Sequence, residues 1–241
     1  MNLKNIQHRI YWNILALSRG SKIVRPVIDI AAFFYYCIFR FRKQFVFNNY
    51  TYTYFYHLHN RTFGGERAIE IPIALKYLFE TKGKNTLEVG DVLSHYVSIN
   101  HDILDKYEKR KGIINEDVAS VSLGKKYDLI LSISTMEHVG HSYGEKLDPN
   151  KFLKGIKNLK RHLTKNGTLV ITVPVYYNPF LTELIIAKKI PFTTVFFMKR
   201  ISYMNDWKQI DYAEAIKGNT YDGYFANTNV LCICVYNNIL K

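Results

Sequence analysis

The 241-residue sequence contains few cysteines, and their positions predict neither a disulfide framework nor a zinc site. Cys37 lies far along the chain from the other two. Cys232 and Cys234 alternate within the apolar run 230–236, which is typical of a buried strand. The absence of paired or metal-spaced cysteines favours a reducing, cytoplasmic setting. We expect Cys232 and Cys234 to be ordinary core residues.

Acidic residues are also scarce, since 20 Asp and Glu stand against 33 Lys and Arg, which gives a net charge of +13. Much of the excess lies near the N-terminus, where Asp29 is the single acid in residues 1–45. The basic residues of that segment are Lys4, Arg9, Arg19, Lys22, Arg25, Arg40, Arg42 and Lys43. Such a surface attracts phosphate-rich partners, either nucleic acid or an anionic membrane face. Charge alone leaves both open.

A long hydrophobic run is missing as well. The apolar stretch 27–39 is shorter than the roughly 20 residues that a membrane-spanning helix needs, and basic residues flank it. We expect either an interfacial helix lying on a membrane or a helix docked on the domain, and we rank a true span last. Residues 1–18 do not show the pattern of a secretory signal, so we do not expect export.

The composition, 48% hydrophobic and 22% charged, fits one globular domain with an appended segment. We expect a basic, aromatic N-terminal extension over residues 1–60 and the main domain over residues 61–241. Within the extension, residues 48–60 alternate Tyr and Thr, which favours a strand. The same aromatics are able to stack nucleic-acid bases, but no basic residue interleaves them, so the strand is preferred.

Helical and strand patterns alternate along the rest of the chain. A helix is expected from Arg67 to about Lys82 and another over 149–163, the latter ending at the Lys165–Gly167 turn. The expected strands are 86–90, 101–104, 112–118, 128–134, 168–173, 192–201 and 229–236, with an insertion over 206–228 before the last. This alternation predicts an α/β fold with a doubly wound, mostly parallel sheet.

Three segments, in order, resemble the motifs of class I S-adenosylmethionine-dependent methyltransferases, especially the type 11 group. LEVG (Leu87 to Gly90) is similar to the first motif, and YDLILSISTMEHVG (Tyr127 to Gly140) to the fourth-strand motif. LKRHLTKNGTLVITVP (Leu159 to Pro174) resembles the helix and fifth strand that follow. The resemblance implies a seven-stranded Rossmann-like sheet and methyl transfer from S-adenosylmethionine to a small-molecule or glycan/lipid-type acceptor.

The resemblance also implies roles for individual residues. Gly90 would approach the methionine part of S-adenosylmethionine, Asp105 would accept hydrogen bonds from the ribose hydroxyls, and Asp117 would lie by the adenine amine. The further cofactor-binding residues expected are Glu88, Ser94 and Ser132. His138 and Glu137 are the first candidates for proton transfer from the acceptor, with His95 and His141 behind them. No metal is expected.

The sequence departs from the family in the loop after the first strand. Val92 and Ser94 occupy the places of the second and third glycines of Gly-x-Gly-x-Gly. The nicotinamide fingerprint Gly-x-Gly-x-x-Gly is absent too, which argues against a dehydrogenase. Ser134–Glu137 does not match the signature for methylating base amines, so nucleic acid ranks lower as a partner. The competing hypothesis is a non-catalytic module of the same fold, which binds an anionic membrane surface through residues 1–47 or a protein partner.

Overall fold

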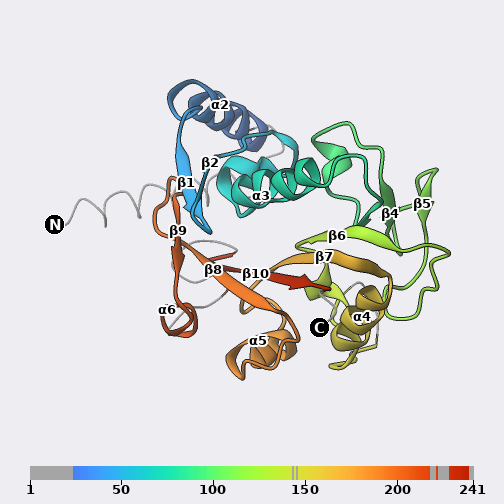
Figure 1. Ribbon diagram of the computed structural model, residues 1–241. Helices are drawn as coiled ribbons and strands as arrows, with labels where there is room; N and C mark the ends of the chain where they lie inside the picture. Colours follow the sequence, from blue (N-terminus) through green and yellow to red (C-terminus); the bar gives the residue numbers. More distant parts are fainter. Residues whose placement is uncertain (1–23, 143, 145, 218–220, 222–227, 239–241) are drawn as a thin grey trace.

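The computed structural model describes residues 24–142, 144, 146–217, 221 and 228–238. Their centre is one eight-stranded sheet (Figure 1). In order across the sheet, the strands are β5 (Ile113–Ile114), β4 (Asp102–Leu104), β3 (Thr86–Val89), β6 (Tyr127–Ile133), β7 (Leu163–Pro174), β10 (Val230–Asn237), β8 (Thr194–Arg200) and β9 (Trp207–Ile210).

The strand directions define the topology. β5, β4, β3, β6 and β7 are mutually parallel, and β10 is antiparallel to both β7 and β8, so β8 runs the same way as β7. If the parallel strands β3 to β8 are numbered 1 to 6 along the chain, their order across the sheet is 3-2-1-4-5-6, which is the order of the doubly wound fold. The antiparallel strand β10 lies between the last two of them, β7 and β8. The predicted mostly parallel, Rossmann-like sheet is confirmed. It has one strand more than the expected seven, because β9 joins the edge antiparallel to β8.

Helices cover both faces of this sheet (Figure 1). The α-helices are α2 (Val24–Phe39), α3 (Arg67–Glu80), α4 (Lys151–Arg161), α5 (Pro179–Ile186) and α6 (Tyr212–Ile216), and the 3-10 helices are η1 (His59–Gly64), η2 (Leu93–His95) and η3 (Met136–His138). Side chains of β6 alternate between the faces. Leu129 and Leu131 pack in a cluster with Ile71 of α3, whereas Ile130 packs with Ile156 of α4.

The expected alternation of strand and helix holds only in part. Residues 90–126 are all described, and they connect β3, β4, β5 and β6 without any α-helix, η2 being the one helical turn among them. Each of these loops begins at the carboxyl end of a parallel strand. This is the edge at which open α/β sheets bind ligands.

Pro72 lies in the interior of α3 rather than in its first turn. A proline there has no N–H to donate to the carbonyl of residue i−4, which is Ala68. The Phe55 amide donates to the Ala68 carbonyl instead, over 2.9 Å. The missing helical bond is thus replaced by one from the segment after the N-terminal hairpin.

Gly167 does not end a helix, contrary to the prediction. α4 ends at Arg161, and Gly167 lies inside β7. A Cβ at this position would lie 2.9 Å from the Tyr127 carbonyl oxygen, so the close approach of β6 requires glycine. The register of the β6–β7 pair shifts at the same place, between Tyr127 and Leu129.

The described part of the N-terminal extension packs against the sheet. β1 (Gln44–Phe47) and β2 (Tyr50–Thr53) form an antiparallel hairpin. Phe45, Phe47 and Tyr52 share a buried cluster with Met198 of β8 and Leu231 of β10. The hairpin and the sheet therefore contribute to one continuous core.

Candidate functional site

A cavity of about 510 Å³ opens at the carboxyl ends of β3, β4 and β6. The chain continues from β3 to β4 on one side, and β6 lies on the other, so this is the switch point of the strand order. Ligands of doubly wound proteins bind at such points. The cavity is lined by Asn60, Arg67, Val89, Gly90, Asp91, Val92, Leu104, Asp105, Lys106, Tyr107, Glu108, Glu116, Asp117, Val118, Ser134, Thr135, His138, Val139 and Lys151.

Gly90 begins the loop that borders the cavity. Its φ is +90°, a conformation that favours glycine, and a Cβ would lie 2.8 Å from Thr135 Cγ2. The neighbouring strand end, rather than space for a ligand, is thus what excludes a side chain here. Gly90 also lines the cavity, which is compatible with the expected role beside a cofactor. That role stays a prediction.

Glu88 is completely buried and does not line the cavity. Its Oε1 accepts hydrogen bonds from the amides of Val92 (3.0 Å) and Leu93 (2.8 Å). Its Oε2 lies 2.8 Å from His101 Nε2. Glu88 therefore holds the loop that follows Gly90 from beneath, so any effect it has on a ligand passes through the loop.

Ser94 and Ser132 also act on the framework around the cavity and not in its wall. The Ser94 hydroxyl donates to Asp91 and accepts a 2.9 Å bond from Arg110, which also pairs with Asp91 over 2.6 Å. The buried Ser132 hydroxyl donates to the Val89 carbonyl over 3.1 Å, which ties β6 to β3. Asp91, which the sequence did not single out, lines the cavity together with its loop neighbours Gly90 and Val92.

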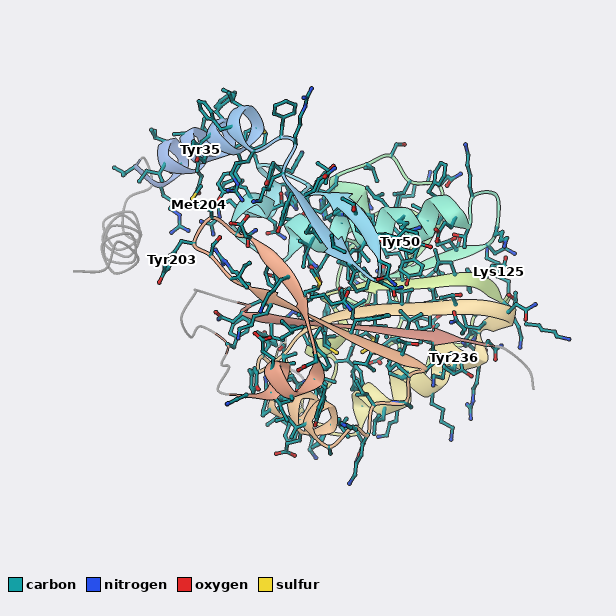
Figure 2. All side chains as sticks on the ribbon, turned by 60° about the vertical axis from the view of Figure 1, so that its left-hand side comes forward. Tyr35, Tyr50, Lys125, Tyr203, Met204 and Tyr236 are labelled. Atoms are coloured by element: carbon teal, nitrogen blue, oxygen red, sulfur yellow. The ribbon has the colours of Figure 1, made fainter. Side chains whose placement is uncertain are left out.

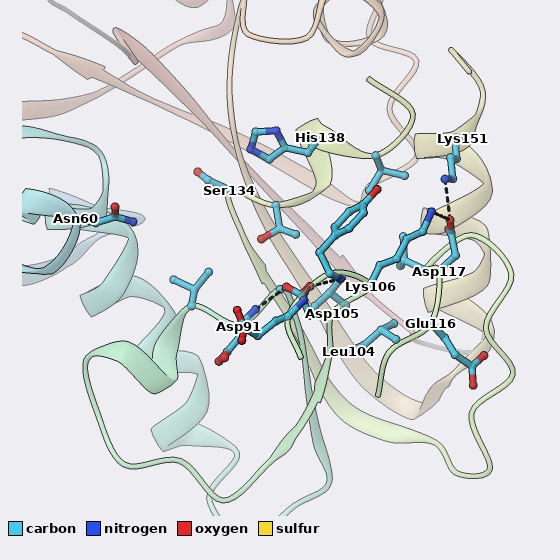
Figure 3. A pocket seen from close by; sticks show the side chains of 18 of the residues that line it. Asn60, Asp91, Leu104, Asp105, Lys106, Glu116, Asp117, Ser134, His138 and Lys151 are labelled. Atoms are coloured by element: carbon cyan, nitrogen blue, oxygen red, sulfur yellow. Dashed lines mark hydrogen bonds and ion pairs between the residues drawn. The ribbon is translucent and has the colours of Figure 1, made fainter. Parts of the chain in front are cut away.

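Asp105 follows β4 and lines the cavity. Its Oδ1 accepts the amides of Tyr107 (2.8 Å) and Glu108 (2.9 Å), and its Oδ2 accepts the Asp91 amide over 3.2 Å (Figure 3). A carboxylate has about four acceptor sites. Three are in use within the protein, so Asp105 retains room for about one further donor.

Asp117 lies on the other side of the cavity, between two lysines (Figure 3). Lys151 Nζ and Lys106 Nζ approach its Oδ2 to 2.7 and 3.0 Å, and the Ala119 amide donates to Oδ1 over 3.0 Å. Burial alone would raise the pKa of this carboxyl, but the hydrogen bonds from Lys151, Ala119 and Lys106 outweigh it and lower the pKa to about 2. Asp117 is therefore ionised at neutral pH.

A buried polar network shapes the wall formed by α3 and β6. Glu70 Oε2 accepts a 2.7 Å bond from Arg67, and Glu70 Oε1 accepts bonds from Ser134 (2.6 Å) and Thr172 (2.5 Å). Ser134 has a φ of +36°, and its carbonyl accepts a 3.5 Å bond from Arg67. Arg67 and Ser134 both line the cavity, so Glu70 fixes a cation and a strand end there.

His138, in η3, lines the cavity near Ser134 (Figure 3). Its Nδ1 lies 3.2 Å from the Tyr177 hydroxyl, which is 3.4 Å from Ser142 Oγ. Burial, followed by the charge of Arg67 and by His141, lowers the pKa of His138. His138 is therefore neutral at pH 7, the state in which an imidazole is able to accept a proton.

Glu137 does not line the cavity and is almost completely buried, with its Oε1 3.9 Å from His138 Nε2. Its Oε2 has no hydrogen-bond partner among the residues that the structure describes. Burial raises the pKa of Glu137 well above its usual range, which favours its protonated form. Its backbone carbonyl accepts a 2.8 Å bond from the buried Asn178 side chain, which positions η3.

The structure thus brings Gly90, Asp105, Asp117 and His138 to one cavity and leaves Glu88, Ser94, Ser132 and Glu137 outside its wall. Of the other two candidate bases, His95 stacks on His59 with ring centroids 4.4 Å apart, and His141 packs beside Tyr177 with centroids 5.9 Å apart. Among the polar cavity residues that the sequence did not indicate are Asn60, Arg67, Asp91, Lys106 and Lys151.

No protein-family model matches the chain, and no curated protein matches it in sequence. Among solved structures, it is similar to the N-methyltransferase NodS from Bradyrhizobium japonicum WM9 in complex with S-adenosyl-l-homocysteine, with 11% identity over 70% of this chain and 85% of that one and a TM-score of 0.43. A possible histamine N-methyltransferase from Thermotoga maritima is 13% identical over 70% and 88% of the two chains, with a TM-score of 0.41. The sugar N-methyltransferase KedS8 from Streptoalloteichus is 12% identical over 73% and 91%, with a TM-score of 0.38. The fold assignment stands on the strand order rather than on these similarities.

Proposed function

We propose that this protein is an S-adenosylmethionine-dependent methyltransferase that binds its cofactor in the cavity at the switch point of the sheet. One observation carries the proposal. Gly90, Asp105 and Asp117, which the family resemblance assigns to the cofactor, follow different strands or loops and yet line a single cavity together with His138.

The cavity suits a ligand of this kind in size and in polarity. Its volume of about 510 Å³ lies within the range of roughly 300–1,000 Å³ that small-molecule and cofactor sites occupy. Asp105 has an acceptor site left for a ribose hydroxyl, and the Arg67 guanidinium provides a cation in the cavity wall, beside Ser134. The residues present therefore fit the cofactor.

The role of the chain is mainly to bind and align. S-adenosylmethionine supplies a methyl group already activated on a sulfonium. Neutral His138 is the group we expect to take the proton from an acceptor hydroxyl or amine. If its Nδ1–H donates to the Tyr177 hydroxyl, 3.2 Å away, Nε2 is the basic nitrogen. Glu137 is buried outside the cavity wall and its pKa is raised, so we assign it a structural role instead.

We propose a small-molecule or glycan/lipid-type acceptor, which would enter beside His138 and Tyr177. Two of the similar structures carry names that specify N-methyl transfer to a sugar or, as a possibility, to histamine, which agrees with an acceptor of modest size. The second candidate is a non-catalytic module of this fold. The Arg110 side chain favours it, because it engages the carboxylate of Asp91, a residue of the cavity wall, within the protein itself.

Calorimetric titration with S-adenosylhomocysteine separates the two functions. The wild-type chain should bind, and Asp105→Asn should bind about tenfold or more weakly, because a hydrogen bond to a charged group contributes about 1.5–3 kcal/mol. Glu183→Gln, an exposed carboxylate on α5 outside the cavity, is the matched control and should bind like the wild type.

Thermal unfolding of each variant checks that the cavity is intact, since Asp105 also accepts three backbone amides. A folded wild-type chain that fails to bind S-adenosylhomocysteine would remove the methyltransferase proposal and leave the non-catalytic module.

A further inference from the structure

α2 presents a wide apolar face to solvent. Of its sixteen residues, Tyr36 is the one that is buried. Val27, Ile38 and Phe39 are 61%, 59% and 72% exposed. The other large apolar side chains exposed on the helix and just beyond it are Val24, Ile30, Phe34, Tyr35 and Phe41. Figure 2 shows α2 at the edge of the molecule, with side chains that project away from the sheet.

The face follows the helical repeat. Val24, Val27, Phe34 and Ile38 recur at intervals of three, seven and four residues, which places them along one side of the helix. Isolated exposed apolar residues are common on soluble proteins, but a contiguous set of this extent marks a binding surface.

The opposite side of α2 is fixed to the domain. Phe33 and Tyr36 pack against Phe63 of η1, with ring centroids 6.3 and 5.5 Å apart. Asp29 pairs with Arg61 over 3.5 Å. The helix is thus held in place with its apolar side outward, and the exposure does not result from a loosely attached segment.

Basic residues flank both ends of this face. Arg25 lies at its start and pairs with Asp29, and Arg42 and Lys43 follow its end, where Lys43 also lies 3.5 Å from Asp206. The sequence that leads into α2, residues 1–23, has four Lys and Arg and no acidic residue. An apolar helix face with basic flanks is the chemistry that an anionic lipid surface recognises.

We propose that α2 docks the protein on an anionic membrane, with the helix in the plane of the interface and its apolar side among the lipid chains. Among the described residues, none of the helices combines the length and the apolar character that crossing a bilayer requires. Binding therefore combines apolar contact with attraction to negative headgroups, and both components must contribute.

The docking surface is connected to the cavity. Arg61, the partner of Asp29, adjoins Asn60, which lines the cavity. Asn60 has a φ of 52° and Arg61 a φ of 45°, which is uncommon for residues other than glycine. The helix on the membrane and the cavity wall thus meet in one sharply bent segment. Membrane docking does not depend on the proposed methyl transfer.

Cosedimentation of the full chain with vesicles tests the proposal. Vesicles of phosphatidylcholine with an equal amount of phosphatidylglycerol should bind the protein, and those of phosphatidylcholine alone should bind it far less. The double variant Phe34→Asp/Ile38→Asp should lower the partition coefficient at least tenfold, because burial of even one such side chain contributes about that factor. Arg42→Gln should lower it about fivefold, and added salt should lower it further.

Two control variants match these changes. Phe79→Asp replaces an exposed phenylalanine at the end of α3, and Lys165→Gln removes an exposed cation in β7; neither should alter vesicle binding.

If the double variant binds like the wild type, α2 is not the docking surface. If the wild type ignores anionic vesicles and the double variant instead abolishes self-association in sedimentation velocity, the face joins two copies of the chain. If the full chain does not bind anionic vesicles but a chain without residues 1–23 does, that segment covers the apolar face of α2 in the full chain. Each of these results overturns the proposal.

Discussion

Gly90→Ala is expected to destabilise the fold even when no ligand is bound. The φ of +90° is strained for alanine, at a cost of about 1–3 kcal/mol. The new methyl would also meet Thr135, with Cγ2 at 2.8 Å, and overpacking of this kind costs about 1–3 kcal/mol. The two effects together predict a loss of about 4 kcal/mol. For a chain of this size that corresponds to a fall in Tm of roughly 10 °C.

Chemical denaturation of the ligand-free chain measures this loss, and a double-mutant cycle separates its two causes. Thr135→Ala removes Oγ1 and Cγ2 and should recover about 1–2 kcal/mol in the Gly90→Ala background, whereas the backbone strain and the 2.9 Å contact with Cβ of residue 135 should remain. The single variant Thr135→Ala must be measured as well, because it loses the 3.1 Å bond from Thr135 to the Ile133 carbonyl.

Gly124→Ala is the matched control, since a Cβ there meets no atom within 4 Å and the φ lies outside the left-handed range. It should change the free energy of unfolding by less than about 1 kcal/mol. If Gly90→Ala were equally harmless without ligand, Gly90 would not be required by its backbone and by Thr135. The reasoning from the structure would then be refuted.

Two further predictions concern the hairpin and the cavity. Tyr54→Phe should lower the free energy of unfolding by about 1–3 kcal/mol in urea, because the Tyr54 hydroxyl accepts a 2.7 Å bond from the buried Trp207 amide; Tyr50→Phe, on the exposed side of the hairpin, should have no effect. The pKa of Asp117 is lowered to about 2 in the folded state, so its ionised form adds stability that is present above pH ~4 and is lost as the pH falls from there through about 2. The difference in unfolding free energy between wild type and Asp117→Asn should therefore shrink as the pH falls over that interval. A difference that does not vary with pH would contradict the ion pairs of Asp117 with Lys106 and Lys151.

Much of the sheet was predictable because its strands are runs of buried apolar residues. The pattern from Asp128 to Ser134 predicted β6, and the two runs near the C-terminus predicted β8 and β10. β9 was not predicted, because only Trp207 of its four residues is buried and the strand therefore has no apolar run. No helix was predicted between the first strands, and the acidic and polar segments around β4 and β5 fold as loops stabilised by Asp105 and by Asn115.

The cavity was predictable where its residues follow strands directly. Asp105 comes immediately after β4, and His138 lies a few residues after β6, so the carboxyl edge of the sheet brings them together. Arg67 gave no such signal, because within the helical pattern of α3 it looks like a solvent-facing residue. Its position depends on Glu70, whose partners Ser134 and Thr172 lie 64 and 102 residues further along the chain.

The loop that lacks two glycines is explained by the residue beneath it. A glycine-rich turn lets the backbone approach a ligand, but its conformation is entropically costly to fix. Here the completely buried Glu88 carboxylate accepts the amides of Val92 and Leu93, so the turn is held by hydrogen bonds. Side chains at positions 92 and 94 are then tolerated, because Val92 packs against the α3 cluster and Ser94 bonds to Asp91 and Arg110. The loop is therefore braced in place, and the absence of the two glycines does not by itself argue against a ligand in the cavity.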